Sequence, residues 1–241
     1  MNESITAIPF SSLLLVFIPA AVVIGLLHAW SLEWKNTIYA VIRMLVQLLL
    51  IGYFLAYIFE SSNAVITVGV LSVMVFAASW IALRTIQQKR REFFQFALMA
   101  ILIGGGLTLL LVTQFVLKLN LWFMPRYMIP LAGMIFASSM NGISLAAERL
   151  QAEMDRNIDY MTARGIALKA ALIPITNSLF AVGLVSLPGM MTGQILSGIS
   201  PLIAVRYQIM VMCMIFSAVG FSTALFLILI KPHLSELRSE E

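Results

Sequence analysis

Long apolar runs separated by short polar segments are the main pattern of this 241-residue chain. A membrane-spanning helix needs about 20 mostly apolar residues. Seven runs meet that length, at about 11–30, 37–59, 64–83, 93–117, 122–147, 171–196 and 204–230. They predict an all-α, polytopic transmembrane bundle of about seven spans. We expect residues 1–241 to form one integral membrane domain, because no stretch resembles a second domain, a linker or a repeat.

The sixth run contains an interruption between Val182 and Gly193. Pro188 lacks a backbone donor and clashes with the preceding turn, and Gly189 tolerates almost any backbone conformation. Hydrocarbon cannot hydrate the backbone groups that such a break frees, so the break must face protein or a water-filled cavity. Since discontinuous membrane helices recur at transport sites, the pattern predicts a Pro/Gly-broken sixth helix in a transporter. That segment is either continuous or re-entrant.

The distribution of Lys and Arg predicts an orientation with the N-terminus outside and the C-terminus inside. Eleven of these residues then lie on the inner side: Lys35, Arg84, Lys89, Arg90, Arg91, Arg149, Arg156, Arg164, Lys169, Lys231 and Arg238. Three lie on the outer side: Lys118, Arg126 and Arg206. This asymmetry is the positive-inside bias of membrane proteins.

Composition agrees with a membrane protein. The chain is 61% hydrophobic and 11% charged, with a mean hydropathy of +0.99, whereas soluble domains are roughly one quarter charged. The pI of about 9.4 does not indicate a nucleic-acid partner, because the basic residues lie between the apolar runs. A single cysteine, Cys213, excludes an internal disulfide.

A few polar residues within the spans are candidates to line a translocation path. Arg43 and Gln47 lie one turn apart on the second span. An arginine inside a membrane is usually paired, snorkelling or functional, and Arg43 is close enough to the inner end of its span to snorkel. We expect Asn177, Ser178 and Ser186 to form a polar lining opposite this pair.

Several kinds of chemistry are absent. No Asp or Glu lies in the middle of a predicted span, and neither His28 nor His233 is central. Proton or sodium coupling usually needs an intramembrane carboxylate, and intramembrane proteolysis needs catalytic groups that are missing here. The chain has no Gly-x4-Gly-Lys-[Ser/Thr] loop. We therefore expect a transport subunit, not an enzyme, with no cofactor of its own and with ATP used by a partner.

The largest hydrophilic segment covers about 148–170, and its apolar residues recur at helical spacing: Leu150, Met154, Ile158 and Met161. Arg164 and Gly165 are typical of a helix end. The segment is predicted either to rest on the membrane surface as an extension of the fifth span or to dock a soluble partner. In the second case the docking residues would be Glu148, Arg149, Arg156, Arg164 and Gly165.

Small residues and methionines concentrate in the later spans. The small residues at four-residue spacing are expected to let helices pack closely: Gly133, Ala137 and Asn141, then Gly220 and Ala224, with the glycines at 104–106 interrupting the fourth span. Most of the 15 methionines are expected to pack. Met190 and Met191, which follow the break, are candidate soft contacts for an ion such as Cu(I). Met210 and Met214 share a helix face from which Met212 points away.

Several motifs together resemble a known permease family. They are Ala171-Leu-Ile-Pro174, the block from Val182 to Gly193, Tyr207-Gln-Ile-Met210, Arg43 with Gln47, Gly52-Tyr53, and Ile129-Pro-Leu-Ala-Gly-Met134 with Asn141. The pattern is similar to the permeases of two-component Fet-type iron-export ABC transporters, whose plant relatives are linked to aluminium tolerance. One departure is a shorter cytoplasmic segment before Ala171.

The resemblance implies a multi-pass permease of the bacterial cytoplasmic (inner) membrane that exports a metal cation, with iron as the expected ion and a separate cytoplasmic ATP-binding subunit. A second permease copy and membrane lipid are the other expected partners. The residues Arg43, Gln47, Asn177, Ser178, Ser186, Pro188, Gly189, Met190 and Met191 would form the translocation path. Two alternatives stay open: an ABC-type permease for an organic substrate such as a nucleotide sugar or lipid, and a membrane scaffold that transports nothing.

Overall fold

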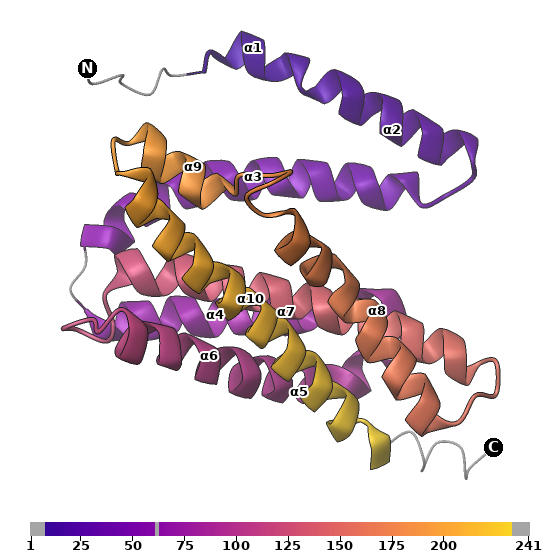
Figure 1. Cartoon of the computed structure of the whole chain (residues 1–241). Helices are drawn as coiled ribbons and strands as arrows, with labels where there is room; N and C mark the ends of the chain where they lie inside the picture. Colours follow the sequence, from indigo (N-terminus) through magenta and orange to yellow (C-terminus); the bar gives the residue numbers. More distant parts are fainter. Residues whose placement is uncertain (1–7, 61–62, 233–241) are drawn as a thin grey trace. The chain divides into compact units, whose positions relative to one another are not determined.

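A computed structural model describes residues 8–60 and 63–232, which are helical apart from the connecting turns (Figure 1). Arg238 and His233 lie outside the described residues. The helical prediction is therefore confirmed for the described ranges. The chain divides into two compact units, residues 1–61 and 62–241.

The first unit is a helical hairpin. Helices α1 (Phe10–Leu15) and α2 (Phe17–Ala29) follow one another closely, and α2 packs against α3 (Trp34–Glu60). Ser31 adopts a left-handed conformation, with φ of 57°, in the turn between α2 and α3. The rings of His28 and Trp34 meet edge to face across this turn, with centroids 5.0 Å apart.

The second unit contains the remaining helices. Helix α4 (Ala64–Ala82) and the short η1 (Arg84–Lys89) lead into a rod made of α5 (Arg90–Ala100), η2 (Ile101–Gly105), α6 (Gly106–Leu110) and η3 (Leu111–Val116). The rod is continuous, so the glycines at 104–106 do not interrupt it. They lie where the rod changes from the π-helical η2 to α6. Then come α7 (Pro125–Met154), α8 (Tyr160–Ala181), α9 (Gly189–Leu196) and α10 (Pro201–Leu229).

Helix α7 is the centre of the second unit and packs against α4, α8 and α10. Its buried residues include Ala132, Ile135, Ile143 and Ala146, all fully shielded, and they belong to one apolar core with Phe226 of α10. With 30 residues, α7 is about 45 Å long. It therefore exceeds the thickness of the hydrocarbon core of a membrane, about 30 Å.

The most extensive helix–helix contact in the second unit joins α7 to α10. Ser222 Oγ donates to Ser139 Oγ at 3.1 Å, and Ser139 Oγ donates to the carbonyl oxygen of Ala218 at 3.2 Å. A Cβ atom on Gly142 would lie 2.7 Å from Thr223 Oγ1. Small side chains allow this approach, since lipid supplies no hydrophobic drive between helices.

The small residues predicted to make such contacts are mostly different ones. Ala137 and Asn141 are exposed, and a Cβ added to Gly220 would meet no other atom within 4 Å. A Cβ on Gly133 would only touch Met74, at 3.4 Å. Four-residue spacing identified the right kind of residue, but not which face of α7 meets α10.

Six helices in the described part of the chain are long and apolar enough to cross a membrane: Ser11–Ala29, Trp34–Glu60, Ala64–Ala82, Arg90–Val116, Pro125–Met154 and Pro201–Leu229. The predicted span 171–196 is not one helix. Helix α8 begins earlier, at Tyr160, and ends at Ala181, and α9 starts only at Gly189. The interruption is therefore a turn over residues 182–188.

The segment 148–170 also differs from the prediction of one helix ending near Gly165. Helix α7 continues to Met154, a turn follows, and Arg164 and Gly165 lie inside the start of α8. Asn157 has a left-handed φ of 62°, and the carboxylate of Asp159 caps α8. These two residues stop one helix and start the next, so the periodic apolar residues belong to two helices.

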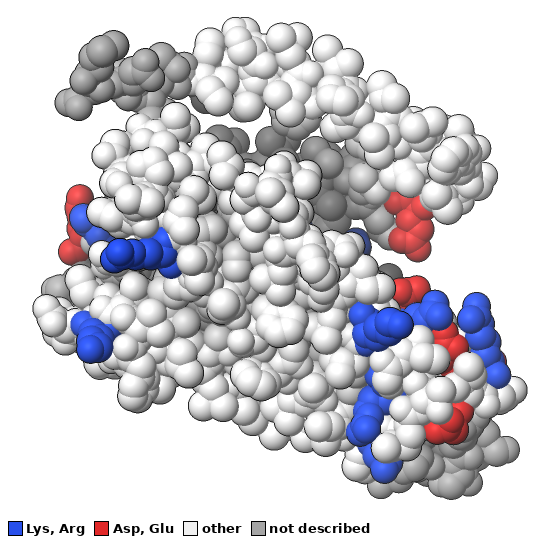
Figure 2. Space-filling model, viewed as in Figure 1, with Lys and Arg blue, Asp and Glu red and all other residues white. Residues whose placement is uncertain are grey.

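Charged residues gather at the two ends of the second unit, with an uncharged surface between them on the face in Figure 2. The turn between α4 and α5 lies beside the last third of α7, because Thr85 Oγ1 donates to the carbonyl oxygen of Ser144. Arg84, Arg149 and Arg156 are therefore at one end. At the other end, Thr67 Oγ1 donates to the carbonyl oxygen of Phe123. This arrangement agrees with the predicted charge asymmetry, while the orientation in the cell stays a prediction.

Substituting Gly104→Ala should destabilise the second unit. The added Cβ would lie 2.7 Å from the backbone nitrogen of Ser222, and overpacking of this kind costs about 1–3 kcal/mol. Gly106→Ala is the matched control, because no atom lies within 4 Å of its Cβ position. Thermal unfolding in detergent should show a lower Tm for Gly104→Ala only, and equal Tm values for the two variants would contradict the packing described here.

Candidate functional site

Three backbone N–H groups of the turn after α8 donate to one carbonyl oxygen, that of Ala181. The backbone N–H groups of Leu184, Val185 and Ser186 all donate to Ala181 O, at 3.2, 2.8 and 3.2 Å. Gly183, with φ of +82°, reverses the chain and donates its N–H to Ser186 O at 3.0 Å. Only glycine adopts such a φ without steric cost. The helix thus ends at Ala181, well before Pro188.

Pro188 starts a helix instead of breaking one. It is extended, with φ of −63° and ψ of 147°, and it precedes Gly189, the first residue of α9. The carbonyl oxygen of Pro188 accepts the N–H of Thr192 at 3.0 Å and its hydroxyl at 3.2 Å. A proline suits a helix start because the first N–H groups have no intrahelical partner.

A cavity of about 330 Å³ lies between this turn, α9 and α10. Its lining residues come from the end of α8 and the turn (Leu179, Val182, Gly183, Leu187), from α9 (Met191) and from α10 (Val205, Gln208, Ile209, Met212, Cys213). The α10 residues share one helix face. Counted from the start of α10 at Pro201, Gln208 lies about 10 Å and Cys213 about 18 Å along the axis. The cavity therefore lies along the first half of α10, a helix that is long and apolar enough to cross a membrane.

Gln208 is the most deeply buried polar residue of this cavity. It is 5% exposed, and its side-chain oxygen Oε1 has no hydrogen-bond partner among the described residues. Leaving a buried acceptor unpaired costs about 1–3 kcal/mol. The oxygen atom itself is enclosed by protein and does not open onto the cavity.

A second cavity, of about 590 Å³, lies on the other side of α10, against the rod from Arg90 to Val116. Met210 and Met214 line it together with Gly104 and Phe221, and Met212 does not. The prediction that Met212 points away from Met210 and Met214 agrees with this arrangement. Cys213 lines both cavities.

The other second-unit residues predicted for the path do not line this cavity, and Asn177 lines a different one with Lys169 and Thr176. Ser178 Oγ donates to the carbonyl oxygen of Pro174 at 2.9 Å, so its hydroxyl is used by its own helix. Asn177 and Ser186 are exposed. Met190 packs against the apolar core. Of the second-unit residues predicted for the path, only Met191 contributes to the wall.

Arg43 and Gln47 belong to the first unit. Both are exposed and lie one turn apart on α3. Their expected position opposite the polar residues of the sixth span stays a prediction.

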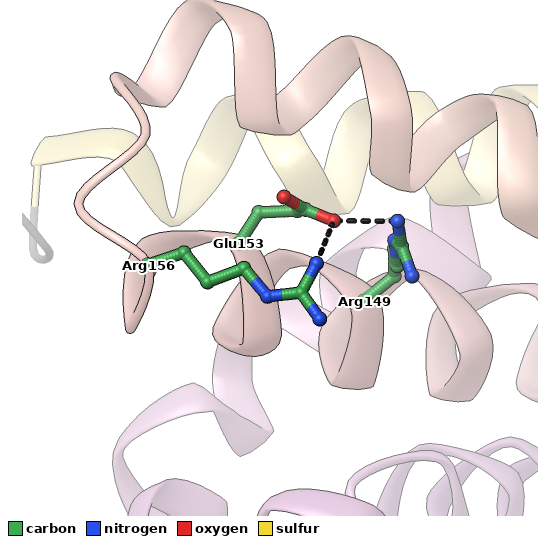
Figure 3. Close-up of polar contacts among 3 residues, drawn as sticks. All are labelled: Arg149, Glu153 and Arg156. Atoms are coloured by element: carbon green, nitrogen blue, oxygen red, sulfur yellow. Dashed lines mark ion pairs between the residues drawn. The ribbon is translucent and has the colours of Figure 1, made fainter.

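The turn between α7 and α8 carries an ionic cluster (Figure 3). Arg149 Nη2 lies 2.6 Å and Arg156 Nη1 3.6 Å from Glu153 Oε1. The Glu153 side chain is 3% exposed, whereas those of Arg149 and Arg156 are 43% and 67% exposed. A buried carboxylate needs paired charge, so Glu153 fixes two arginines at the surface of this turn.

Two further contacts fix the start of α8. Asp159 Oδ1 accepts the backbone N–H groups of Met161 and Thr162 at 3.0 and 3.2 Å. Hydrogen bonds from the Thr162 hydroxyl and from these N–H groups hold the pKa of Asp159 below its usual value, so the cap is retained at neutral pH and lost as the pH falls through that lowered pKa. Tyr160 donates its hydroxyl to the carbonyl oxygen of Leu227 on α10.

Comparison with known proteins identifies the family. The profile of the uncharacterised protein family UPF0014 matches residues 10–234. The chain belongs to the UPF0014 family.

Three members show how far the similarity extends. "Probable iron export permease protein FetB" of Escherichia coli K12 is 34% identical over 241 residues, covering 92% of this chain and 87% of FetB. "UPF0014 membrane protein slr1647" of Synechocystis is 34% identical, covering 75% and 76%. "Protein ALUMINUM SENSITIVE 3" of Arabidopsis thaliana is 34% identical, covering 87% and 80%. No solved structure matches the chain.

The family predicted from the motifs is therefore confirmed, and this UPF0014 chain is a multi-pass membrane protein. The cavity residues Gln208, Met212 and Cys213 were not among the predicted path residues. Gln208 and Met212 are four residues apart and share a helix face, but sequence alone does not indicate that the turn after α8 covers that face. Among the described residues, no three His, Cys, Asp or Glu side chains group as metal ligands.

Gly183→Ala should destabilise the turn that forms the cavity wall. At φ of +82° a Cβ costs about 1–2 kcal/mol. Gly189→Ala, outside the left-handed region and with no atom within 4 Å of its Cβ position, is the control. Hydrogen exchange of residues 182–188 should be faster in Gly183→Ala than in Gly189→Ala. Equal exchange would show that the left-handed turn does not form.

Proposed function

We propose that this chain is the membrane-spanning permease subunit of an ABC-type transporter that exports a metal cation, iron in particular, from a bacterial cell. The observation that carries the proposal is the helix interruption at residues 182–188, which walls a cavity beside α10, a candidate membrane span. It occurs in a chain similar over most of its length to a protein named as a probable iron export permease.

The interruption suits a transport site for a physical reason. Irregular backbone at membrane depth is tolerated where it is buried in protein or lines a cavity. Here the N–H groups of residues 184–186 are satisfied by Ala181 O. The adjoining cavity between the end of α8, α9 and α10 is the proposed place for cargo.

The energy source in this proposal is a separate ATPase. The sequence contains no Gly-x4-Gly-Lys-[Ser/Thr] loop, so ATP would be bound and hydrolysed by a cytoplasmic partner. The turn between α7 and α8 is the proposed docking surface, with Glu148, Arg149, Arg156, Arg164 and Gly165. Figure 2 shows the charged residues gathered at this end of the second unit. We expect two permease copies and two ATPase subunits in the assembly.

Charge reversal at the proposed docking surface should weaken binding of the ATPase subunit. Arg156→Glu removes an exposed cation and adds an anion near Glu153, and Arg164→Glu changes a cation with no ion pair to Glu153. Arg126→Glu, at the opposite end of α7, is the control. The ATPase subunit should co-purify with wild type and Arg126→Glu, and at least about tenfold less with the other two. Equal recovery from all four, with helical content unchanged, would refute this docking surface.

Loss of the permease and its ATPase should raise cellular iron. Cells lacking both genes should accumulate iron when the medium is rich in it, because the proposed efflux route is gone, and a plasmid carrying both genes should restore the wild-type level. Total iron by mass spectrometry of washed cells measures this. An unchanged iron content in the deletion strain would refute iron as the substrate. ATP-dependent movement of an organic compound in vesicles would favour the organic-substrate alternative, and no flux at all would favour a scaffold.

A further inference from the structure

An arginine and three aromatic side chains form a cluster where α4 ends and α5 begins: Phe76, Trp80, Arg90 and Phe94. Arg90 Nε and Nη2 both donate to the carbonyl oxygen of Trp80, at 2.9 and 2.7 Å. The Cζ atom of Arg90 lies 4.0 Å from the centroid of the Trp80 ring, within the range of a cation–π contact. Because the last carbonyl groups of a helix lack intrahelical partners, these contacts cap α4 and hold the guanidinium group in one place.

The aromatic rings extend this cluster along α4, away from the charge. Phe94 meets Trp80 edge to face, with centroids 5.8 Å apart, and stacks on Phe76 at 6.1 Å. Phe76 lies one turn before Trp80 on the same face of α4, about 6 Å further from the end of the helix. Phe76 and Trp80 are 53% and 42% exposed, on a helix apolar enough to cross a membrane. One face of α4 therefore presents exposed rings with a cation at its end.

A second cation lies beside the first. Arg84, in the turn that follows α4, is exposed and close enough to Arg90 for the two positive charges to repel each other. In the described part of the chain, neither arginine pairs with a carboxylate. Guanidinium groups bind phosphate through paired N–H donors. Two of them beside an apolar face are complementary to a molecule that joins a phosphate group to a hydrocarbon chain.

We propose that this cluster binds one anionic phospholipid, such as phosphatidylglycerol, with the phosphate against Arg84 and Arg90 and an acyl chain along Trp80 and Phe76. The site goes beyond the proposed function, because it requires only that the chain spans a membrane. Tryptophan is enriched where lipid headgroups meet hydrocarbon, which is the depth at which the phosphate and the acyl chains of one lipid join. In the predicted orientation, the site faces the inner leaflet.

A soluble protein fits this face less well. It could reach the arginines, but Phe76 lies more than one turn inside the end of a candidate span. A general attraction between cations and an anionic membrane would act on every exposed cation at this end, including Arg91. Arg91 follows Arg90 directly and is rotated from it by about 100° around α5. It therefore provides a control of equal charge at almost the same depth.

The test uses the purified full-length chain in phosphatidylcholine vesicles that contain a small fraction of phosphatidylglycerol. Bromine atoms on the acyl chains of either lipid quench the fluorescence of a tryptophan that they touch. The substitutions Trp30→Phe, Trp34→Phe and Trp122→Phe leave Trp80 as the only tryptophan. At equal mole fractions, brominated phosphatidylglycerol should quench Trp80 more strongly than brominated phosphatidylcholine does.

The arginine variants in this background test the headgroup contact. The apparent affinity for phosphatidylglycerol should fall about fivefold in Arg84→Gln and in Arg90→Gln, because each arginine near an anionic lipid surface contributes a similar attraction. It should stay unchanged in Arg91→Gln. The Arg84→Gln variant keeps the contacts between Arg90 and Trp80, so it tests the site even if Arg90→Gln alters the end of α4. Circular dichroism of each variant controls for folding.

Several outcomes would overturn the lipid site. They are equal quenching by the two brominated lipids, an equal loss of affinity in Arg91→Gln, and reversal of the quenching by inorganic phosphate, which has no acyl chain. Reduced recovery of the ATPase subunit with Arg84→Gln, together with unchanged quenching, would assign this face to a protein partner instead. A deletion strain with unchanged iron would overturn iron export alone, since the lipid site is measured without cargo or ATP.

Discussion

The need to pair every backbone polar group in a medium without water determines how the rest of this structure is built. Where the apolar run after Tyr160 stops being helical, three successive N–H groups converge on Ala181 O. That convergence lets a non-helical turn exist beside α10. After this turn, a separate helix, α9, begins at Gly189, directly after Pro188. Without this pairing, the chain would have to cross as one continuous helix, and no cavity would form there.

In the second unit, buried polar groups are also paired where helices pack closely. The Ser222 hydroxyl donates to the Ser139 hydroxyl, which donates to the carbonyl oxygen of Ala218, so α7 and α10 pair polar atoms where they touch. Buried glycines on the rod and on α7 remove the side chains that would keep the helices apart. At the charged end, Glu153 holds Arg149 and Arg156. In the interior, polar groups therefore fix the position of α7 relative to α10. At the charged end, they hold two arginines at the surface.

Sequence patterns predicted the helical class, the family and the general place of the interruption. They placed the break at Pro188 because proline and glycine are the usual helix breakers, but Gly183 makes the reversal and Pro188 begins the next helix. The prediction of one helix ending at Gly165 was wrong. The sequence does contain the signals for the observed boundaries, because Asn is often left-handed at a helix end and Asp often caps a helix start, as Asn157 and Asp159 do here. The cavity residues Gln208 and Cys213 required tertiary structure. Helical periodicity defines a face without saying which element covers it.

Helix α8 joins the charged turn at one end to the cavity wall at the other. Its 22 residues extend about 33 Å, and near its start the Tyr160 hydroxyl is held by Leu227 of α10. This contact fixes the start of α8 against α10. For a rigid rod of this length, a tilt of about 5° about its start moves the far end by about 3 Å. A tilt of α8 would therefore change the width of the cavity that its far end lines.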